Sequence, residues 1–120
     1  MTTHSPDIEK VKRYFKKDQF ANLLGIELVE LSLGRAVARM TLRKDHYNSI
    51  SIAHGGAIFT LADLAFAAAS NSHGLIAVAI NANISFLKAT STGTLTATAE
   101  EVCRSRKLAT YTIRIQDEEG

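Results

Sequence analysis

The chain has little cysteine: Cys103 is the single one among its 120 residues. One thiol cannot form a disulfide within the chain, and such sparse use of cysteine is typical of proteins from a reducing compartment. No histidine signal accompanies Cys103, so we expect a packed or edge thiol rather than a nucleophile.

The chain also lacks a large excess of charge of either sign. It has 14 Lys and Arg against 12 Asp and Glu, a formal net charge of +2. The basic residues neither dominate nor follow one helix face, which excludes a typical nucleic-acid-binding surface. The first ten residues, MTTHSPDIEK, contain no apolar segment of a secretory signal. These absences predict a cytoplasmic enzyme or binding protein.

Long hydrophobic runs are absent as well, and the one extended apolar stretch is informative. Gly55 to Ala69 carries a single charged residue, Asp63, and no proline. The stretch is shorter than the roughly 20 residues of a membrane span, and its alanine-rich composition predicts a buried helix. Because a carboxylate on such a helix is costly to bury without compensation, Asp63 indicates a site.

The rest of the pattern predicts two short helices and several strands. Ser5, Pro6 and Asp7 are typical of a helix start, and Asp18 and Gly25 bracket a second helical segment. Beyond Gly25, apolar and β-branched residues alternate with polar ones, which predicts strands. The expected strands cover about residues 26–31, 36–42, 76–87, 93–103 and 107–116.

Consecutive strands on both sides of one apolar helix indicate an α+β fold, with an antiparallel sheet wrapped around that helix. By length, residues 1–120 form a single domain. Asp117 to Gly120 is a hairpin signal without a returning strand, and an unpaired sheet edge is usually covered. We therefore expect a closing strand to be missing after Gly120 or to come from elsewhere.

The central stretch, HGGAIFTLADLAFAAASNS, resembles the signature of hotdog-fold acyl-CoA thioesterases, in the branch typified by the phenylacetate-degradation thioesterase PaaI. Asn48 stands six residues before His54, 84–88 is similar to the family's central strand, and 104–106 matches a frequent basic turn. The resemblance covers about residues 20–120 and implies a hotdog fold and thioester hydrolysis. The family has one more strand after the acidic turn.

The chemistry of the motif agrees with this resemblance. Backbone N–H groups of Gly55 and Gly56 at a helix N-terminus attract a negative oxygen, as an oxyanion does. Asp63 is suited to attack a carbonyl or to deprotonate water. The alternatives are that the glycines only allow a tight turn and that Asp63 is a structural acid bonded to neighbouring polar groups.

Geometry adds a constraint. Gly55 and Asp63 are 63 − 55 = 8 residues apart, or roughly 12 Å along a helix. If both serve one reaction, they must come from two copies of the chain, which predicts a homodimer at minimum. The resemblance implies the same arrangement, and we expect a homotetramer.

Other residues complete the expected site. By resemblance, Asn48 positions the carbonyl or the water and His54 shapes the oxyanion pocket; alternatively, His54 is a structural hydrogen-bonder. Asn81 and Asn83 share one face of their strand, toward substrate, solvent or a dimer edge. The phosphates of CoA suit four basic residues, which are otherwise plain surface: Lys88, Arg104, Arg106 and Lys107.

Three apolar residues of the central stretch belong either to an acyl pocket or to the core: Phe59, Leu61 and Phe66.

The leading interpretation is an acyl-CoA thioesterase that hydrolyses an aryl- or medium-chain acyl-CoA to free acid and CoA. It needs no cofactor, and the histidine spacings predict no metal site. The alternative is a non-catalytic acyl-CoA binding module on the same fold. A dehydratase of this fold, which pairs Asp with His on another motif, and a nucleic-acid binder are poorer matches.

Overall fold

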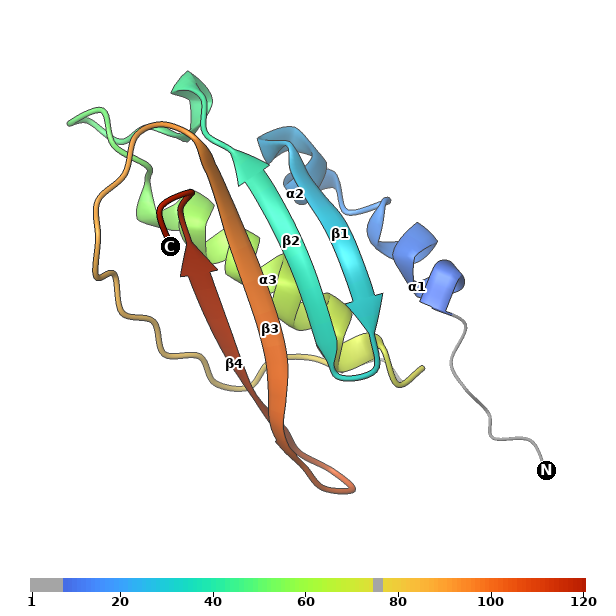
Figure 1. Ribbon diagram of the computed structural model, residues 1–120. Coiled ribbons are helices and arrows are strands. Elements are labelled where there is room, and N and C mark those ends of the chain that lie inside the picture. Colours follow the sequence, from blue (N-terminus) through green and yellow to red (C-terminus); the bar gives the residue numbers. More distant parts are fainter. Residues whose placement is uncertain (1–7, 75–76) are drawn as a thin grey trace.

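An antiparallel sheet with one long helix packed across it makes up most of the molecule (Figure 1). The computed structural model describes residues 8–74 and 77–120. In the described residues the sheet has four strands in the order β1-β2-β3-β4, each pair antiparallel. The elements are α1 (Ile8–Phe15), α2 (Gln19–Leu24), β1 (Ile26–Ser32), β2 (Arg35–Thr41), the 3-10 turn η1 (Lys44–His46), α3 (Gly55–Asn71), β3 (Thr94–Arg104) and β4 (Ala109–Gln116).

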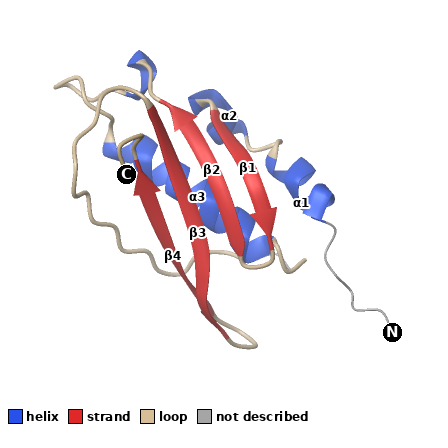
Figure 2. Cartoon of the chain, in the orientation of Figure 1, coloured by secondary structure: helices blue, strands red, loops and turns tan. Residues whose placement is uncertain are grey.

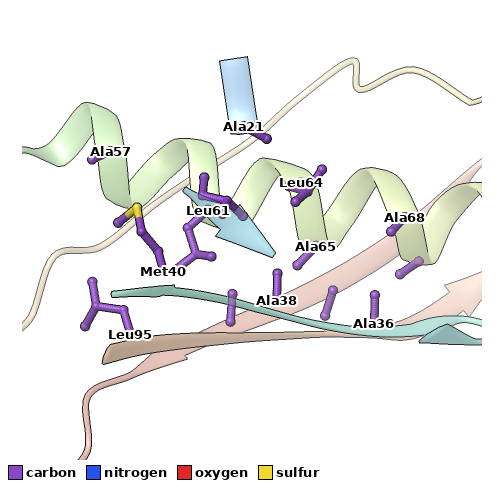
Figure 3. Close-up of a cluster of buried hydrophobic side chains, with 14 of the residues drawn as sticks. Ala21, Ala36, Ala38, Met40, Ala57, Leu61, Leu64, Ala65, Ala68 and Leu95 are labelled. Atoms are coloured by element: carbon purple, nitrogen blue, oxygen red, sulfur yellow. The ribbon is translucent and has the colours of Figure 1, made fainter. Parts of the chain in front are cut away.

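Alanine allows α3 to lie close against the sheet. On the inner face of β2 and β3, Ala38 pairs with Ala97 and Ala36 with Ala99, and all four are fully buried. Figure 3 shows alanine and leucine side chains of α3 pointing down onto these strands. Small side chains on both surfaces shorten the distance between helix and sheet, and the larger Met40, Leu61 and Leu95 fill the remaining space.

Leu61 is the large α3 side chain at the centre of this core, with no exposed surface. We expect Leu61→Ala to lower the free energy of unfolding by about 2–5 kcal/mol, because it leaves a cavity that the small neighbours cannot fill. Urea denaturation measures the loss. Leu108→Ala, at a side chain that is 62% exposed, serves as the control and should change stability by less than about 0.5 kcal/mol. Equal losses in the two variants would contradict this account of the core.

The predicted helix boundaries agree with the structure where it describes them. The Asp18 carboxylate accepts a hydrogen bond from the Ala21 N–H at 3.0 Å and caps α2. Gly25 ends α2 in the left-handed conformation, with φ 73°. The start predicted at Ser5 to Asp7 lies outside the described residues. In residues 8–74 and 77–120, no helix has the length and apolar character needed to cross a membrane.

The strand predicted over residues 76–87 is wrong for its described part. Residues 77–87 have no regular secondary structure, and Ile76 lies outside the described residues. Figure 2 shows this segment as a long loop between α3 and β3. Val78 and Ile80 are 82% and 79% exposed. A strand needs a hydrogen-bonded neighbour, and neither described edge of the sheet pairs with this segment, so its β-prone composition alone is insufficient.

Candidate active site

The loop before α3 is built around Asn48. Its side-chain oxygen accepts hydrogen bonds from the N–H groups of Ile50 at 3.0 Å and Ile52 at 3.2 Å. Its backbone N–H donates to the Ile52 carbonyl at 2.9 Å. The Asn48 amide nitrogen makes no hydrogen bond to any residue that the structure describes. Asn48 therefore holds the loop with its oxygen and keeps two N–H donors for other use.

His54 caps the N-terminus of α3. Its Nδ1 accepts a hydrogen bond from the Gly56 N–H at 2.8 Å, and its carbonyl accepts from Ala57 and Ile58. The Gly55 N–H, by contrast, has no hydrogen-bond partner in the described part of the chain. Of the two glycines in the motif, Gly55 is therefore the one with a free donor at the positive end of the helix dipole.

Asp63 lies two turns further along α3 and is solvent-exposed in the single chain. Its carboxylate makes no hydrogen bond or ion pair with a described residue, which disfavours the structural alternative. Partial burial among apolar neighbours raises the pKa of Asp63, and the negative charge of Asp18 adds to this shift. A carboxylate with a raised pKa is a stronger base than an ordinary one.

Asp63 lines a cavity of about 870 Å³ between α3, β4 and the loop over residues 79–90, which we call the α3–β4 cavity. Its walls are mainly apolar, and Phe59 and Phe66 of α3 contribute to them. Leu61, the third residue considered for an acyl pocket, is instead fully buried in the core. The α3–β4 cavity is therefore suited to an apolar group next to one carboxylate.

The other predicted binding residues are spread over the chain. Asn83 and Lys88 line the α3–β4 cavity. Lys88 forms ion pairs with Asp117 at 2.7 Å and Glu119 at 3.6 Å, and these contacts join the loop to the turn after β4. Asn81 lies on the same loop, is exposed and does not line this cavity.

The basic turn lies far from Gly55 within one chain. Arg104, Arg106 and Lys107 are exposed at the β3–β4 connection. Figure 1 shows this connection at the lower end of the sheet, whereas α3 begins near the upper end. A single chain therefore does not bring these cations and the Gly55 N–H together. Among residues 8–74 and 77–120, no group of three His, Cys, Asp or Glu side chains is close enough to hold a metal ion.

The sequence did not single out a polar cluster beyond the α3–β4 cavity, formed by His73, Glu101 and Tyr111. The Tyr111 hydroxyl donates to Oε1 of Glu101 at 2.9 Å, and Nε2 of His73 lies 2.9 Å from the same oxygen. Tyr111 shares the half-buried face of β4 with Ile113 and Ile115. The alternating pattern of β4 carries no signal for contacts of Glu101 with Tyr111, 10 residues away, and His73, 28 residues away.

This cluster gives stability a defined pH dependence. Partial burial acts to raise the pKa of Glu101, but the hydrogen bonds from Tyr111 and His73 hold it below its ordinary value. Because the folded pKa is the lower one, this stabilisation is present above the ordinary value of 4.5 and is lost as pH falls through the folded pKa. The difference in melting temperature between wild type and Glu101→Gln should therefore stay constant from pH 7 to about pH 5 and shrink as the pH falls below 4.5. A constant difference would show that ionised Glu101 contributes nothing.

Known proteins share the sequence pattern of this chain. Residues 51–120 match the thioesterase superfamily. A protein of Archaeoglobus fulgidus with the provisional name of an esterase is 44% identical over 112 residues, which cover 92% of this chain and 73% of that protein. The acyl-coenzyme A thioesterase PaaI of Escherichia coli is 40% identical over 106 residues, covering 88% of this chain and 76% of the relative.

Solved structures give the same result. The structure of E. coli PaaI superposes with a TM-score of 0.88 at 37% identity, over 92% of this chain and 81% of that one. A mutant of the phenylacetic acid degradation protein PaaI from Thermus thermophilus superposes with a TM-score of 0.79 at 37% identity, over 82% and 86%. The long apolar helix against an antiparallel sheet is thus the hotdog fold, and the chain belongs to the thioesterase superfamily as a PaaI-like thioester hydrolase.

Proposed function

We propose that this protein hydrolyses an aryl- or medium-chain acyl-CoA to the free acid and CoA, at a site that two protomers build together. The observation that carries the proposal is the position of Asp63. Its carboxylate has a raised pKa, lies on the wall of an apolar cavity and has no partner among the described residues. The Gly55 N–H of one protomer polarises the thioester carbonyl. Asp63 of the partner subunit acts on its carbon.

Asp63 could act in either of two roles, and each gives a balanced hydrolysis of the thioester. As a general base, it takes a proton from water while the hydroxide oxygen bonds to the carbonyl carbon. As a nucleophile, it forms a mixed anhydride that water then hydrolyses. In both routes the negative carbonyl oxygen faces the Gly55 N–H, the C–S bond breaks, and the CoA thiolate leaves and is protonated. In this proposal the amide nitrogen of Asn48, which has no partner among the described residues, orients the carbonyl or the water.

If Gly55 and Asp63 act on the same carbon, the geometry of α3 calls for a second protomer. The Gly55 N–H and the Asp63 side chain lie on one helix, roughly 12 Å apart by its rise per residue. One thioester carbon cannot contact both in the same chain. A two-fold dimer pairs each Gly55 with the other chain's Asp63 and yields two equivalent sites. We propose a dimer of this kind as the catalytic unit, within a tetramer. Arg104, Arg106 and Lys107, remote in one chain, then become candidates for the CoA phosphates across the assembly.

A panel of CoA esters tests the proposed function. Aryl and straight-chain acyl-CoA substrates are incubated with the protein, and released CoA is measured with a thiol-trapping dye. We expect turnover of aryl and medium-chain esters. Ligand binding without thiol release would identify a non-catalytic acyl-CoA binding module instead. A single turnover in ¹⁸O-water tests the nucleophilic role of Asp63: label that appears in the Asp63 carboxylate indicates covalent attack, with water hydrolysing the anhydride at the Asp63 carbon.

A further inference from the structure

Two aromatic side chains stand at one end of the α3–β4 cavity. Along α3 the cavity is lined from Ile58 to Phe66, and along β4 from Gln116 back to Tyr111. Phe66 and Tyr111 are therefore the lining residues of these two elements that lie farthest from Gly55. Phe66 follows Asp63 by three residues and lies on the same helix face, one turn further on. Both rings consequently lie on the side of Asp63 that faces away from the start of α3.

The two rings touch each other. Their centroids are 5.5 Å apart and their planes are inclined by 71°, an edge-to-face arrangement that aromatic pairs favour. One ring comes from the helix and the other from the sheet. The contact therefore joins the two layers at this end of the cavity.

A hydrogen bond of its hydroxyl group also holds the Tyr111 ring in position. Its hydroxyl donates to Glu101 of β3, whose carboxylate also contacts His73 in the turn after α3. That turn is tied to the β1–β2 connection, since the Gly34 N–H donates to the Ser72 hydroxyl at 2.7 Å. Glu101 lies at a β-bulge, where the register between β3 and β4 shifts. None of these polar groups takes part in the proposed hydrolysis.

We propose that Tyr111, together with Phe66, is the end wall that limits the length of the acyl group, and that Glu101 and His73 are positioning residues that hold this wall in place. The inference rests on the proposed function, because it takes the α3–β4 cavity as the acyl site. From Asp63 to Phe66 the helix rises by about 4.5 Å, so the wall stands less than one helical turn beyond Asp63 along α3. We therefore expect the wall to accept an aryl or medium-chain acyl group and to exclude a long straight chain.

Chain-length selectivity tests the wall. The value of kcat/KM is measured for straight-chain acyl-CoA esters from butanoyl to palmitoyl, with wild type, Tyr111→Ala and Phe66→Leu. We expect Tyr111→Ala to raise the ratio of long-chain to short-chain kcat/KM by about tenfold or more, since even one methylene in an apolar pocket changes specificity by that factor. Phe66→Leu, which shortens the wall from the helix side, should shift the ratio in the same direction. The ratio is independent of the fraction of folded enzyme.

The positioning role is tested separately. Tyr111→Phe keeps the ring and loses its hydrogen bond, and Glu101→Ala loses the acceptor. Each should move the profile by a few-fold toward longer chains. The double variant Tyr111→Phe/Glu101→Ala should move the profile no further than either single variant, because both substitutions remove the same hydrogen bond between Tyr111 and Glu101. Glu101→Gln keeps an oxygen that accepts the Tyr111 hydrogen bond, so this variant should have the same chain-length profile as the wild type. Tyr14→Phe is the matched control: Tyr14 is 61% exposed and pairs edge-to-face with Phe15 on α1.

Binding measurements separate this inference from the proposed function. Calorimetric titration with straight-chain carboxylates of increasing length reports the wall without any turnover. A length limit that moves to longer carboxylates in Tyr111→Ala supports the wall even if no ester is hydrolysed. A limit in wild-type hydrolysis and binding that stays the same in both Tyr111→Ala and Phe66→Leu overturns it, while leaving the thioesterase intact.

Discussion

Asp63→Asn is expected to lower kcat by about 10²–10⁴-fold, the range typical of a lost general base, while the protein stays folded and oligomeric. The amide has nearly the same shape as the carboxylate but neither accepts a proton nor attacks a carbonyl. Since the carboxylate makes no hydrogen bond to a described residue, no structural contact is lost with it. Steady-state hydrolysis with the thiol-trapping dye measures the loss, and size-exclusion chromatography monitors the assembly.

The matched control is Asp45→Asn. Asp45 pairs with Arg43 on the surface at 3.2 Å and does not line the α3–β4 cavity. It should leave kcat within about twofold, because an exposed ion pair contributes little to stability. Full turnover by a folded Asp63→Ala variant would exclude Asp63 from the reaction.

The pH profile gives an independent readout of the same group. Burial raises the pKa of Asp63 above 3.8, and only the ionised form is active in either proposed role. Activity should therefore fall on the acid side, with an apparent pKa above 3.8. The residual activity of Asp63→Asn should lack this limb. An acid limb of the same position in both proteins would assign it to another group.

Gly55→Pro is expected to lower kcat by about 10²–10³-fold, the usual effect of removing one oxyanion donor. Proline lacks the N–H but is well accepted at the first position of a helix, so α3 should keep its start. His54 has φ −65° and ψ 137°, the extended conformation that a residue before proline favours. A Cβ at Gly55 lies 3.4 Å from the Phe86 ring, an ordinary contact. Circular dichroism verifies that the helix content is unchanged.

Gly55→Ala is the control for this substitution, because it adds the same Cβ and retains the N–H. It should keep most of the activity. Equal losses in the alanine and proline variants would attribute the effect to the side chain and exclude the amide as the oxyanion donor.

The two inactive variants together test the shared site. When Asp63→Asn and Gly55→Pro protomers are refolded as a mixture, half of the dimers are mixed, and each mixed dimer regains one of its two sites. Activity should recover to about a quarter of the wild-type value if the two groups act across the two-fold axis. If both groups act within one chain, every site in the mixture carries one of the two defects, and no recovery occurs.

Local chemistry made most of the fold predictable. The charge-poor stretch from Gly55 required a buried helix, Asp18 and Gly25 required helix ends, and strict alternation required β3 and β4. These are short-range effects of side-chain type on backbone conformation, so the local sequence pattern is enough to predict them. The separation of Gly55 and Asp63 also followed from sequence, since helix rise is nearly constant.

Tertiary structure decided what depends on distant neighbours. Residues 77–87 have a strand-like composition but no hydrogen-bonded partner, and strand formation needs one. Which glycine keeps a free N–H depended on the His54 side chain, which occupies the Gly56 donor. The contacts of Glu101 with Tyr111 and with His73 join β4, β3 and the turn after α3. Sequence by itself thus determined the long helix and the positions of Gly55 and Asp63 on it. Only the packing of helix on sheet decided which side chains surround Asp63, because that packing brings together residues from separate elements.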